Sequence, residues 1–350
     1  VTVTAINDEP SIACTGGTPT FAEDGAAVSL FTSCTVLAGG AGGDVETDAI
    51  ASMVFTVTNV ADTSEIINFD GTAITLAAGQ SDDTAGTQTG QGVAYAVTGC
   101  STTCTVTLTA ATGEMTLAEL DAAVEAMTYS NSDQSPSIAS TRVVTITTLT
   151  DEGSSSSPHD NSATEADAAT VTLTKSNDLP TTGDQTKTIL EDATYTAASG
   201  DFTFADVDGD SITHIKITTV ESAGDLEYDD TDVTVNLEIA IGNIGLLTFD
   251  PVANANGATY ATFQFTVKDG TAYSSGAGVI TIAVTAVNDA PAVSGGNTGT
   301  ATEATNNVDD TETGTLTSTD DEGNTRTWCI QSVSESGGTC SASGTYGSIV

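Results

Sequence analysis

The segment Ala-Thr-Phe-Gln-Phe-Thr-Val at residues 261–267 alternates polar and apolar side chains, and the turn sequence Lys-Asp-Gly follows it at 268–270. Because successive side chains of a β-strand point to opposite faces, the pattern predicts a strand that buries Phe263, Phe265 and Val267. The same alternation recurs in four other segments, at residues 53–60, 104–109, 142–149 and 212–219. Many short, Thr- and Val-rich strands between Gly- and Asp-rich turns predict an all-β fold of β-sandwiches.

The middle of the chain fits a sandwich of seven strands, and the pattern places several of them. They are residues 186–190, 193–204, a strand that begins at Ile212, and residues 261–267 and 279–287. Successive strands of such a sandwich reverse direction, so alternate loops lie at opposite poles of the domain.

One helix is predicted within this β pattern, in the first part of the chain. Thr116 and Glu119 have the spacing of a capping box, in which each side chain satisfies a backbone N–H of the first helical turn. Apolar residues then recur at helical spacing: Leu117, Leu120, Val124 and Met127.

An alternating run followed by Asn-Asp-x-Pro occurs three times, with its asparagine at Asn7, Asn177 and Asn288. Proline removes a backbone donor and ends a strand, so each copy reads as a last strand that runs into a linker. The predicted domains are residues 1–6 (the last strand of a preceding domain), 7–176, 177–287 and 288–350, the last of them a truncated sandwich.

The charge of the chain is strongly one-sided. Its 350 residues include 48 Asp and Glu against 6 Lys and Arg, which gives a net charge of −42. Binding to nucleic acid is excluded because too few cations are present to neutralise phosphates, and adhesion to an anionic bilayer is disfavoured for the same reason. No apolar run is long enough to span a membrane, so direct membrane insertion is not expected either. Self-repulsion at this density requires counter-ions, and an Asp-rich surface suits a hard cation such as Ca²⁺.

Acidic residues gather where the strand order predicts the poles of the domains. Glu191 is expected beside Asn288 and Asp289, and the Asp206-Val-Asp-Gly-Asp210 loop beside Asn177 and Asp178. Similar acids flank strands of the first and last domains. The candidate metal ligands are therefore Glu23, Asn177, Asp178, Glu191, Asp206, Asp208, Asp210, Asn288, Asp289 and Asp320. The alternative is a set of solvated acidic turns, since Asp and Gly are common turn residues.

The six cysteines fall in three close pairs: Cys14 with Cys34, Cys100 with Cys104, and Cys329 with Cys340. None has the spacing of a zinc site or a redox motif. An even number in local pairs favours three disulfides in an oxidising compartment, and buried free thiols are the alternative.

The middle domain resembles the bacterial cadherin-like tandem repeats of large surface proteins. The resemblance lies in Asp-Phe-Thr-Phe-Ala-Asp-Val-Asp-Gly-Asp (201–210), Leu-Thr-Phe-Asp-Pro (247–251), Asn-Ala-Asn-Gly (254–257) and residues 284–291. The last domain is similar to a VCBS-type repeat through residues 315–317, 327–328 and 344–348, and the first to a longer relative through residues 62–66, 69–71 and 142–153. The resemblance implies tandem Ig-like sandwiches in a linear array that are extracellular, often calcium-dependent, and built into adhesins or other giant secreted proteins.

Catalytic motifs are missing from the sequence. The chain has two histidines, His159 and His214, and carries no nucleophile elbow, zinc-protease motif or phosphate-binding loop. Carboxylate pairs abound, but acids this frequent make any single pair uninformative as a glycosidase dyad. We therefore predict that the segment is not an enzyme.

Three functions are compatible with these features. The preferred one is a secreted, cell-surface segment in which Ca²⁺ stiffens a rod of repeats for attachment or matrix formation, with neighbouring repeats of the same chain and an unknown surface ligand as partners. The second is a subunit of a self-assembling extracellular filament or surface layer, in which copies of the chain are the partners. The third is a non-catalytic spacer module of a secreted enzyme.

Overall fold

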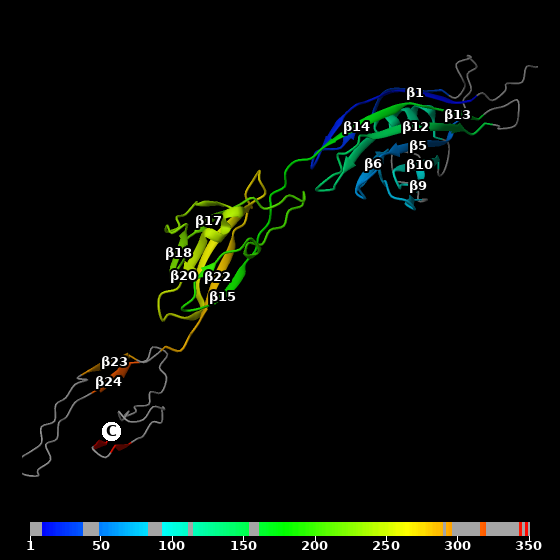
Figure 1. Ribbon diagram of the computed structural model, residues 1–350. Coiled ribbons are helices and arrows are strands. Elements are labelled where there is room, and N and C mark those ends of the chain that lie inside the picture. Colours follow the sequence, from blue (N-terminus) through cyan, green and yellow to red (C-terminus); the bar gives the residue numbers. More distant parts are fainter. Residues whose placement is uncertain are drawn as a thin grey trace, which may run out of the picture. The chain divides into compact units, whose positions relative to one another are not determined.

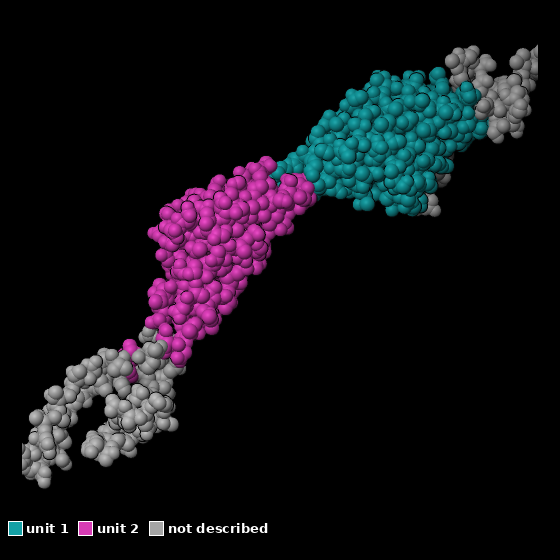
Figure 2. Space-filling view, in the orientation of Figure 1, with its two compact units in different colours: residues 1–178 teal, residues 179–350 magenta. Residues whose placement is uncertain are grey.

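A computed structural model describes most of the chain. It covers residues 9–37, 49–82, 93–110, 115–153 and 161–289, and the short strands β23 (Ala292–Gly295), β24 (Leu316–Thr319), β25 (Ser343–Gly344) and β26 (Gly347–Ser348). The chain divides into two compact units, Val1–Asp178 and Leu179–Val350 (Figure 2). In both, the described residues are mainly β-strand, and the all-β prediction is confirmed.

Unit 1 is a sandwich built on a large sheet whose strands lie side by side in Figure 1. Its strand order is β2 (Thr20–Ala22), β14 (Ala168–Thr174), β12 (Arg142–Asp151), β5 (Ile50–Thr58), β10 (Thr103–Ala110), β9 (Val93–Gly99) and β8 (Ser81–Asp82), with β13 (Ser162–Thr164) also paired to β12. A four-stranded sheet joins β3 (Val28–Ser29), β11 (Thr128–Asn131), β6 (Glu65–Phe69) and β7 (Thr72–Thr75), and a ribbon pairs β1 (Ser11–Gly16) with β4 (Phe31–Leu37).

Alternation of apolar residues creates the core of unit 1. Phe55, Val106 and Ile146 point inward from the large sheet and belong to one buried cluster with Ile67 and Tyr129 of the small sheet. The Thr and Val residues between them on β5, β10 and β12 point outward. The period-2 pattern in the sequence therefore places the core correctly.

The single α-helix of the described residues, α1 (Leu117–Glu125), is the predicted one. Thr116 Oγ1 accepts the Glu119 N–H at 3.3 Å, and Glu119 Oε2 accepts the Thr116 N–H at 2.9 Å, so the capping box is confirmed. Leu120 and Val124 are buried in the core of unit 1.

Two of the three predicted disulfides are present. Cys14–Cys34 joins β1 to β4, and Cys100–Cys104 closes the turn between β9 and β10. Cys329 and Cys340 lie outside the described residues.

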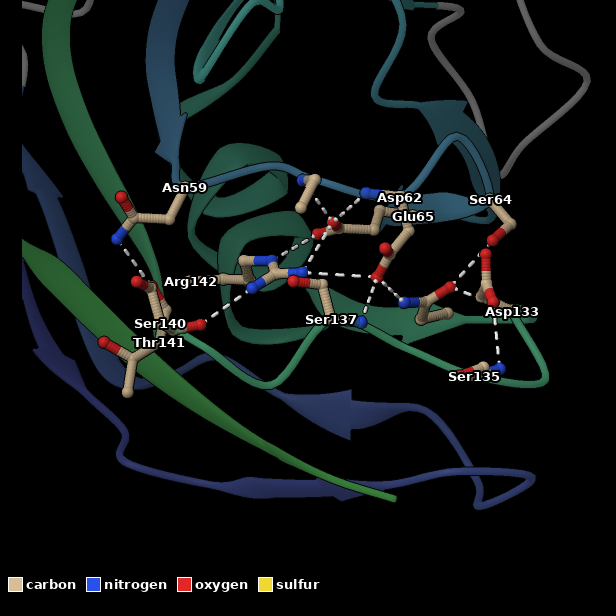
Figure 3. Close-up of polar contacts among 12 residues, drawn as sticks. Asn59, Asp62, Ser64, Glu65, Asp133, Ser135, Ser137, Ser140, Thr141 and Arg142 are labelled. Atoms are coloured by element: carbon tan, nitrogen blue, oxygen red, sulfur yellow. Dashed lines mark hydrogen bonds and ion pairs between the residues drawn. The ribbon is translucent and has the colours of Figure 1, made fainter. Parts of the chain in front are cut away.

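A buried charged network holds one end of unit 1 together (Figure 3). The Arg142 guanidinium donates to both carboxylate oxygens of Glu65, from Nε at 2.8 Å and from Nη2 at 2.9 Å, and Nη2 also reaches Asp62 at 3.3 Å. Tyr129 donates its hydroxyl to Glu65 Oε2 at 2.9 Å, and Asn131 donates its amide to Asp62 Oδ2 at 2.9 Å. The network ties β6, β11 and β12 together, and Arg142 and Glu65 are 1% and 0% exposed.

Unit 2 is a smaller sandwich. Its five-stranded sheet has the order β15 (Gln185–Leu190), β22 (Gly278–Thr285), β21 (Gly257–Lys268), β17 (His214–Thr219) and β19 (Glu238–Ala240), and the facing sheet has the order β16 (Tyr195–Thr196), β20 (Leu247–Asp250) and β18 (Asp225–Tyr228). Two 3₁₀ turns, η1 (Ser199–Asp201) and η2 (Ile241–Leu246), complete it. Phe263 and Phe265 are buried as expected, and Phe265 packs edge-on against Phe202 with ring centroids 4.8 Å apart.

One predicted strand of unit 2 is wrong. Residues 193–204 form only the short strand β16, followed by η1 and a loop. Asp201 Oδ2 accepts hydrogen bonds from the Tyr195 hydroxyl at 2.7 Å and the Ala198 N–H at 2.9 Å, and these bonds stabilise a turn. A side chain that binds nearby backbone competes with strand pairing, so the alternating Phe202 and Phe204 do not continue the strand.

Candidate metal-binding sites

In each unit the chain leaves the sandwich beside a buried glutamate. The strand before the glutamate pairs in parallel with the last strand of the sandwich, so both end at the same pole. In unit 1, Ala22 of β2 lies opposite Thr174 of β14, and Glu23 comes next. In unit 2, Leu190 of β15 lies opposite Thr285 of β22, and Glu191 comes next.

The two glutamates make the same backbone contacts. The Glu23 N–H donates to the Thr174 carbonyl at 2.9 Å, and Glu23 Oε2 accepts the Ser176 N–H at 2.7 Å. The Glu191 N–H donates to the Thr285 carbonyl at 3.1 Å, and Glu191 Oε1 accepts the Val287 N–H at 2.6 Å. Each glutamate thus holds the backbone one residue before an Asn-Asp pair. The sequence repeat therefore corresponds to a repeat in three dimensions.

One carboxylate oxygen of each glutamate is left without a donor among the residues that the structure describes. Glu23 is 7% exposed and Glu191 is 3% exposed, and the unmatched atoms are Glu23 Oε1 and Glu191 Oε2. A buried carboxylate oxygen with no donor is costly, and a bound cation is one of the few partners that can satisfy it. This orphaned oxygen is the feature of the fold that points most directly to a metal ion.

The Asn-Asp pair that follows each sandwich adopts a similar arrangement. The Asn177 side chain donates to the Asp178 carbonyl at 2.7 Å, and the Asn288 side chain donates to the Asp289 carbonyl at 3.3 Å. One carboxylate oxygen of Asp178 lies within 4.8 Å of one of Glu23. The structure therefore brings Glu23 and Asp178 together, and it places Asn288 and Asp289 directly after the backbone held by Glu191.

The predicted Asp loop lies where the chain enters unit 2. Thr181 and Ala205 exchange backbone hydrogen bonds at 2.8 and 3.0 Å, which places the following loop beside the incoming segment. Asp206, Asp208 and Asp210 each offer one oxygen, and these atoms lie within 4.8 Å of one another. This is the cluster that the Asp-Val-Asp-Gly-Asp spacing predicts.

The loop geometry is set by its own backbone. Asp206 Oδ1 accepts the Asp210 N–H at 3.1 Å, while Asp206 Oδ2 is buried and has no hydrogen-bond partner within the described part of the chain. Gly209 has φ +78°, a left-handed conformation that glycine adopts without steric cost. The turn this allows directs the three carboxylates toward one point.

These groups suit calcium by their chemistry. The candidate ligands are carboxylate and amide oxygens, and no His or Cys belongs to the clusters described here. Oxygen-only sets with several carboxylates favour hard cations such as Ca²⁺ over Zn²⁺ or copper. The residues present therefore fit calcium. Asp320, the remaining candidate, lies outside the described residues.

A second acidic cluster was not predicted from the sequence. Asp225 and Glu227 project from β18 beside Asp232, with one oxygen of each within 4.8 Å of the others. Partial desolvation and the nearby charges of Asp225 and Asp230 raise the pKa of Glu227. The i, i+2 spacing places Asp225 and Glu227 on the same side of a strand, and this was the only sequence signal for the cluster. The third member could not be predicted, because the pairing of Glu227 with Asp232 is visible only in the structure.

The fold and these sites define an Ig-like sandwich for unit 2, and the comparison with protein families agrees. Residues 177–283 match the family described as "Bacterial Ig domain". A VCBS-type repeat is not matched, and half of the residues of that resemblance lie outside the described part. No curated protein matches the chain.

Solved structures with some likeness include cadherin and protocadherin domains. Protocadherin gamma B7 extracellular cadherin domains 1–4 align at 12% identity and TM-score 0.37, covering 89% of this chain and 60% of that one. Mouse clustered PcdhgC3 EC1-3 aligns at 14% identity and TM-score 0.29, covering 80% of this chain and 68% of that one. Drosophila N-cadherin EC1-3 aligns at 10% identity and TM-score 0.21, covering 80% of this chain and 69% of that one. With TM-scores below 0.5, these likenesses carry no inference about function.

Among the described residues no helix is both long and apolar enough to cross a bilayer.

Proposed function

We propose that this chain is a structural and adhesive segment of an extracellular repeat protein, and that Ca²⁺ binds at the linker end of its units. The repeated contact of Glu23 and Glu191 with the outgoing backbone carries the proposal. In both units a buried carboxylate holds the linker and keeps one oxygen free of donors in the described structure.

Charge gives calcium a role in this chain. At −42, like charges repel and oppose compact packing at low ionic strength. Bound Ca²⁺ would supply positive charge beside the carboxylates of these sites. Glu23 and Glu191 hold the backbone at the start of each linker by hydrogen bonds, and the Asn-Asp pair follows directly. Fixing these groups limits the bending of the linkers, so the repeats act as a stiff rod.

Secretion to the cell surface or matrix accompanies this role. Two disulfides in unit 1 are typical of proteins that mature in an oxidising compartment. The bacterial Ig match agrees with a non-catalytic module, and we propose that the segment has no enzyme activity of its own. Neighbouring repeats and a surface ligand would be its partners.

The metal part is tested by calorimetric titration of the chelated protein with CaCl₂. We expect binding in the wild type and the loss of a site in Glu191→Gln, which keeps the shape of the side chain and removes its charge. Asp225→Asn, in the other acidic cluster, is the matched control and should leave that site unchanged. Equal titrations for wild type and Glu191→Gln would refute the assignment of Glu191.

The mechanical part needs a separate measurement. Small-angle scattering with excess Ca²⁺ and with EDTA should give a longer and narrower distance distribution when calcium is present. A distribution that does not change on chelation, in protein shown by titration to bind calcium, would refute the stiffening role.

A further inference from the structure

The large sheet of unit 1 has an outward face of unusual composition. Hydrogen-bonded partners on five adjacent strands form rows across this face, and the central row is Thr98, Thr105, Thr56, Thr145 and Ala168. The rows on either side of it hold only Thr, Ala, Val and Ser. These side chains are half-buried or exposed, and the apolar residues between them face the core.

This face carries no charge on the strands that form it. Strands β14, β5, β10 and β9 contain no Asp, Glu, Lys or Arg. Strand β12 has Arg142 and Asp151 at its two ends, and both side chains are turned inward and 1% exposed. In a chain of net charge −42, five neighbouring strands without an outward carboxylate form a distinct surface.

The layer on the other side of the core is acidic by contrast. Asp70 lies near Glu119, and Asp121 near Glu125, at the helix and the small sheet. Burial, and then repulsion from these neighbours, raises the pKa values of Asp70 and Asp121. Two copies of the chain that met through this layer would bring like charges together, which costs binding energy.

The charge-free face of the large sheet avoids this repulsion between like charges, so a second copy of this chain is the partner that it fits. Small, uncharged side chains leave the sheet flat enough for two such faces to stack about 10 Å apart. With strands spaced by about 4.8 Å and residues by about 3.4 Å, five strands of seven residues cover roughly 600 Å² per copy. The roughly 1,200 Å² buried in total is at the lower limit for a specific interface, as expected for a weak dimer.

We propose that the charge-free face of strands β14, β12, β5, β10 and β9 is a homotypic docking surface through which two copies of the chain pair by a two-fold axis. The contact is independent of the calcium sites and of the linkers. Because the same face is used on both copies, the pairing closes as a dimer rather than an open chain.

Sedimentation equilibrium tests this pairing. The protein is measured in EDTA, so that calcium plays no part, and in about 1 M NaCl, where the Debye length of about 3 Å screens the overall repulsion. We expect wild-type mass to rise toward that of a dimer as concentration approaches about 1 mM, and Thr105→Glu to weaken association at least about tenfold. Thr105→Lys should weaken it as well, because either charge must lose its hydration at the contact.

Thr281→Glu is the matched control. Thr281 also points outward from a central strand, but on the five-stranded sheet of unit 2, between Thr186 and Thr262. The Thr281→Glu variant should associate as strongly as the wild type. Circular dichroism should show that all variants remain folded. A wild type that stays monomeric at about 1 mM, or association that Thr105→Glu and Thr105→Lys leave intact, would overturn the proposal. Calcium binding can persist in that case, so this failure is separate from failure of the proposed function.

Discussion

Replacing Arg142 by methionine is expected to destabilise unit 1 by about 3–5 kcal/mol, because it breaks a buried ion pair on one side only. The guanidinium is 1% exposed and donates to both oxygens of Glu65, and its Nη1 donates to the Ser140 carbonyl at 2.7 Å. Methionine can fill much of the same space but donates no hydrogen bond. Glu65, which is 0% exposed, would then keep a buried charge close to that of Asp62 without its cationic partner.

The loss is large enough to measure in the intact chain. For a unit of this size each kcal/mol shifts Tm by about 2–4 °C, so we expect Tm to fall by roughly 6–20 °C. Hydrogen exchange of the β5 and β12 amides reports unit 1 and gives its opening free energy without interference from unit 2. The partly exposed pair Lys216–Glu238, 2.9 Å apart in unit 2, supplies the control, and Lys216→Met should cost at most about 1–2 kcal/mol.

A double variant tests the cause. If the uncompensated charge of Glu65 is responsible, adding Glu65→Gln to Arg142→Met should cost less than the sum of the two single changes. A loss below about 1 kcal/mol in Arg142→Met, or strictly additive effects in the double variant, would refute the reasoning.

Three further predictions follow from single contacts. Thr116→Ala removes the helix cap and should lower the stability of unit 1 by about 1 kcal/mol in urea unfolding, whereas Thr116→Ser should not. Burial by itself would raise the pKa of Asp201, but hydrogen bonds from Lys187 and other donors outweigh it and the pKa is lowered. Its stabilisation is therefore complete above the unfolded pKa of about 3.9 and is lost as pH falls through the lower folded value, so Asp201→Asn should flatten the acid limb of a stability–pH curve for unit 2. Replacing Cys14 and Cys34 by serine should cost about 2–4 kcal/mol in calorimetry, and reduction of the wild type should have a similar effect.

Local patterns in the sequence were sufficient for the central strands of the two larger sheets and for the helix. Alternation identified the strands around Phe55, Val106 and Phe263, and the Thr116–Glu119 spacing identified the helix. Both signals depend on which side of a strand or helix faces the core, which neighbouring residues determine. The domain boundaries and the metal roles of the acidic residues remain predictions.

Contacts of individual polar side chains were beyond the reach of those patterns, whether the partner lies near or far along the chain. The turn at Asp201 ended a predicted strand because its carboxylate found Tyr195 and the Ala198 amide. The Arg142–Glu65 pair joins residues 77 positions apart, and neither its burial nor its geometry is visible in the local sequence.

The sequence by itself determined that this chain is all-β, acidic and repetitive, because periodicity and charge are local properties. Cysteine spacing favoured disulfides, and the structure shows two of them. Only the tertiary structure decided that Glu23 and Glu191 are buried beside the outgoing chain, each with one oxygen that has no hydrogen-bond donor among the described residues. It also decided that outward side chains of five strands merge into one uncharged face. Both results arise from strand register, which brings residues far apart in sequence next to one another and sets which side of each strand meets water.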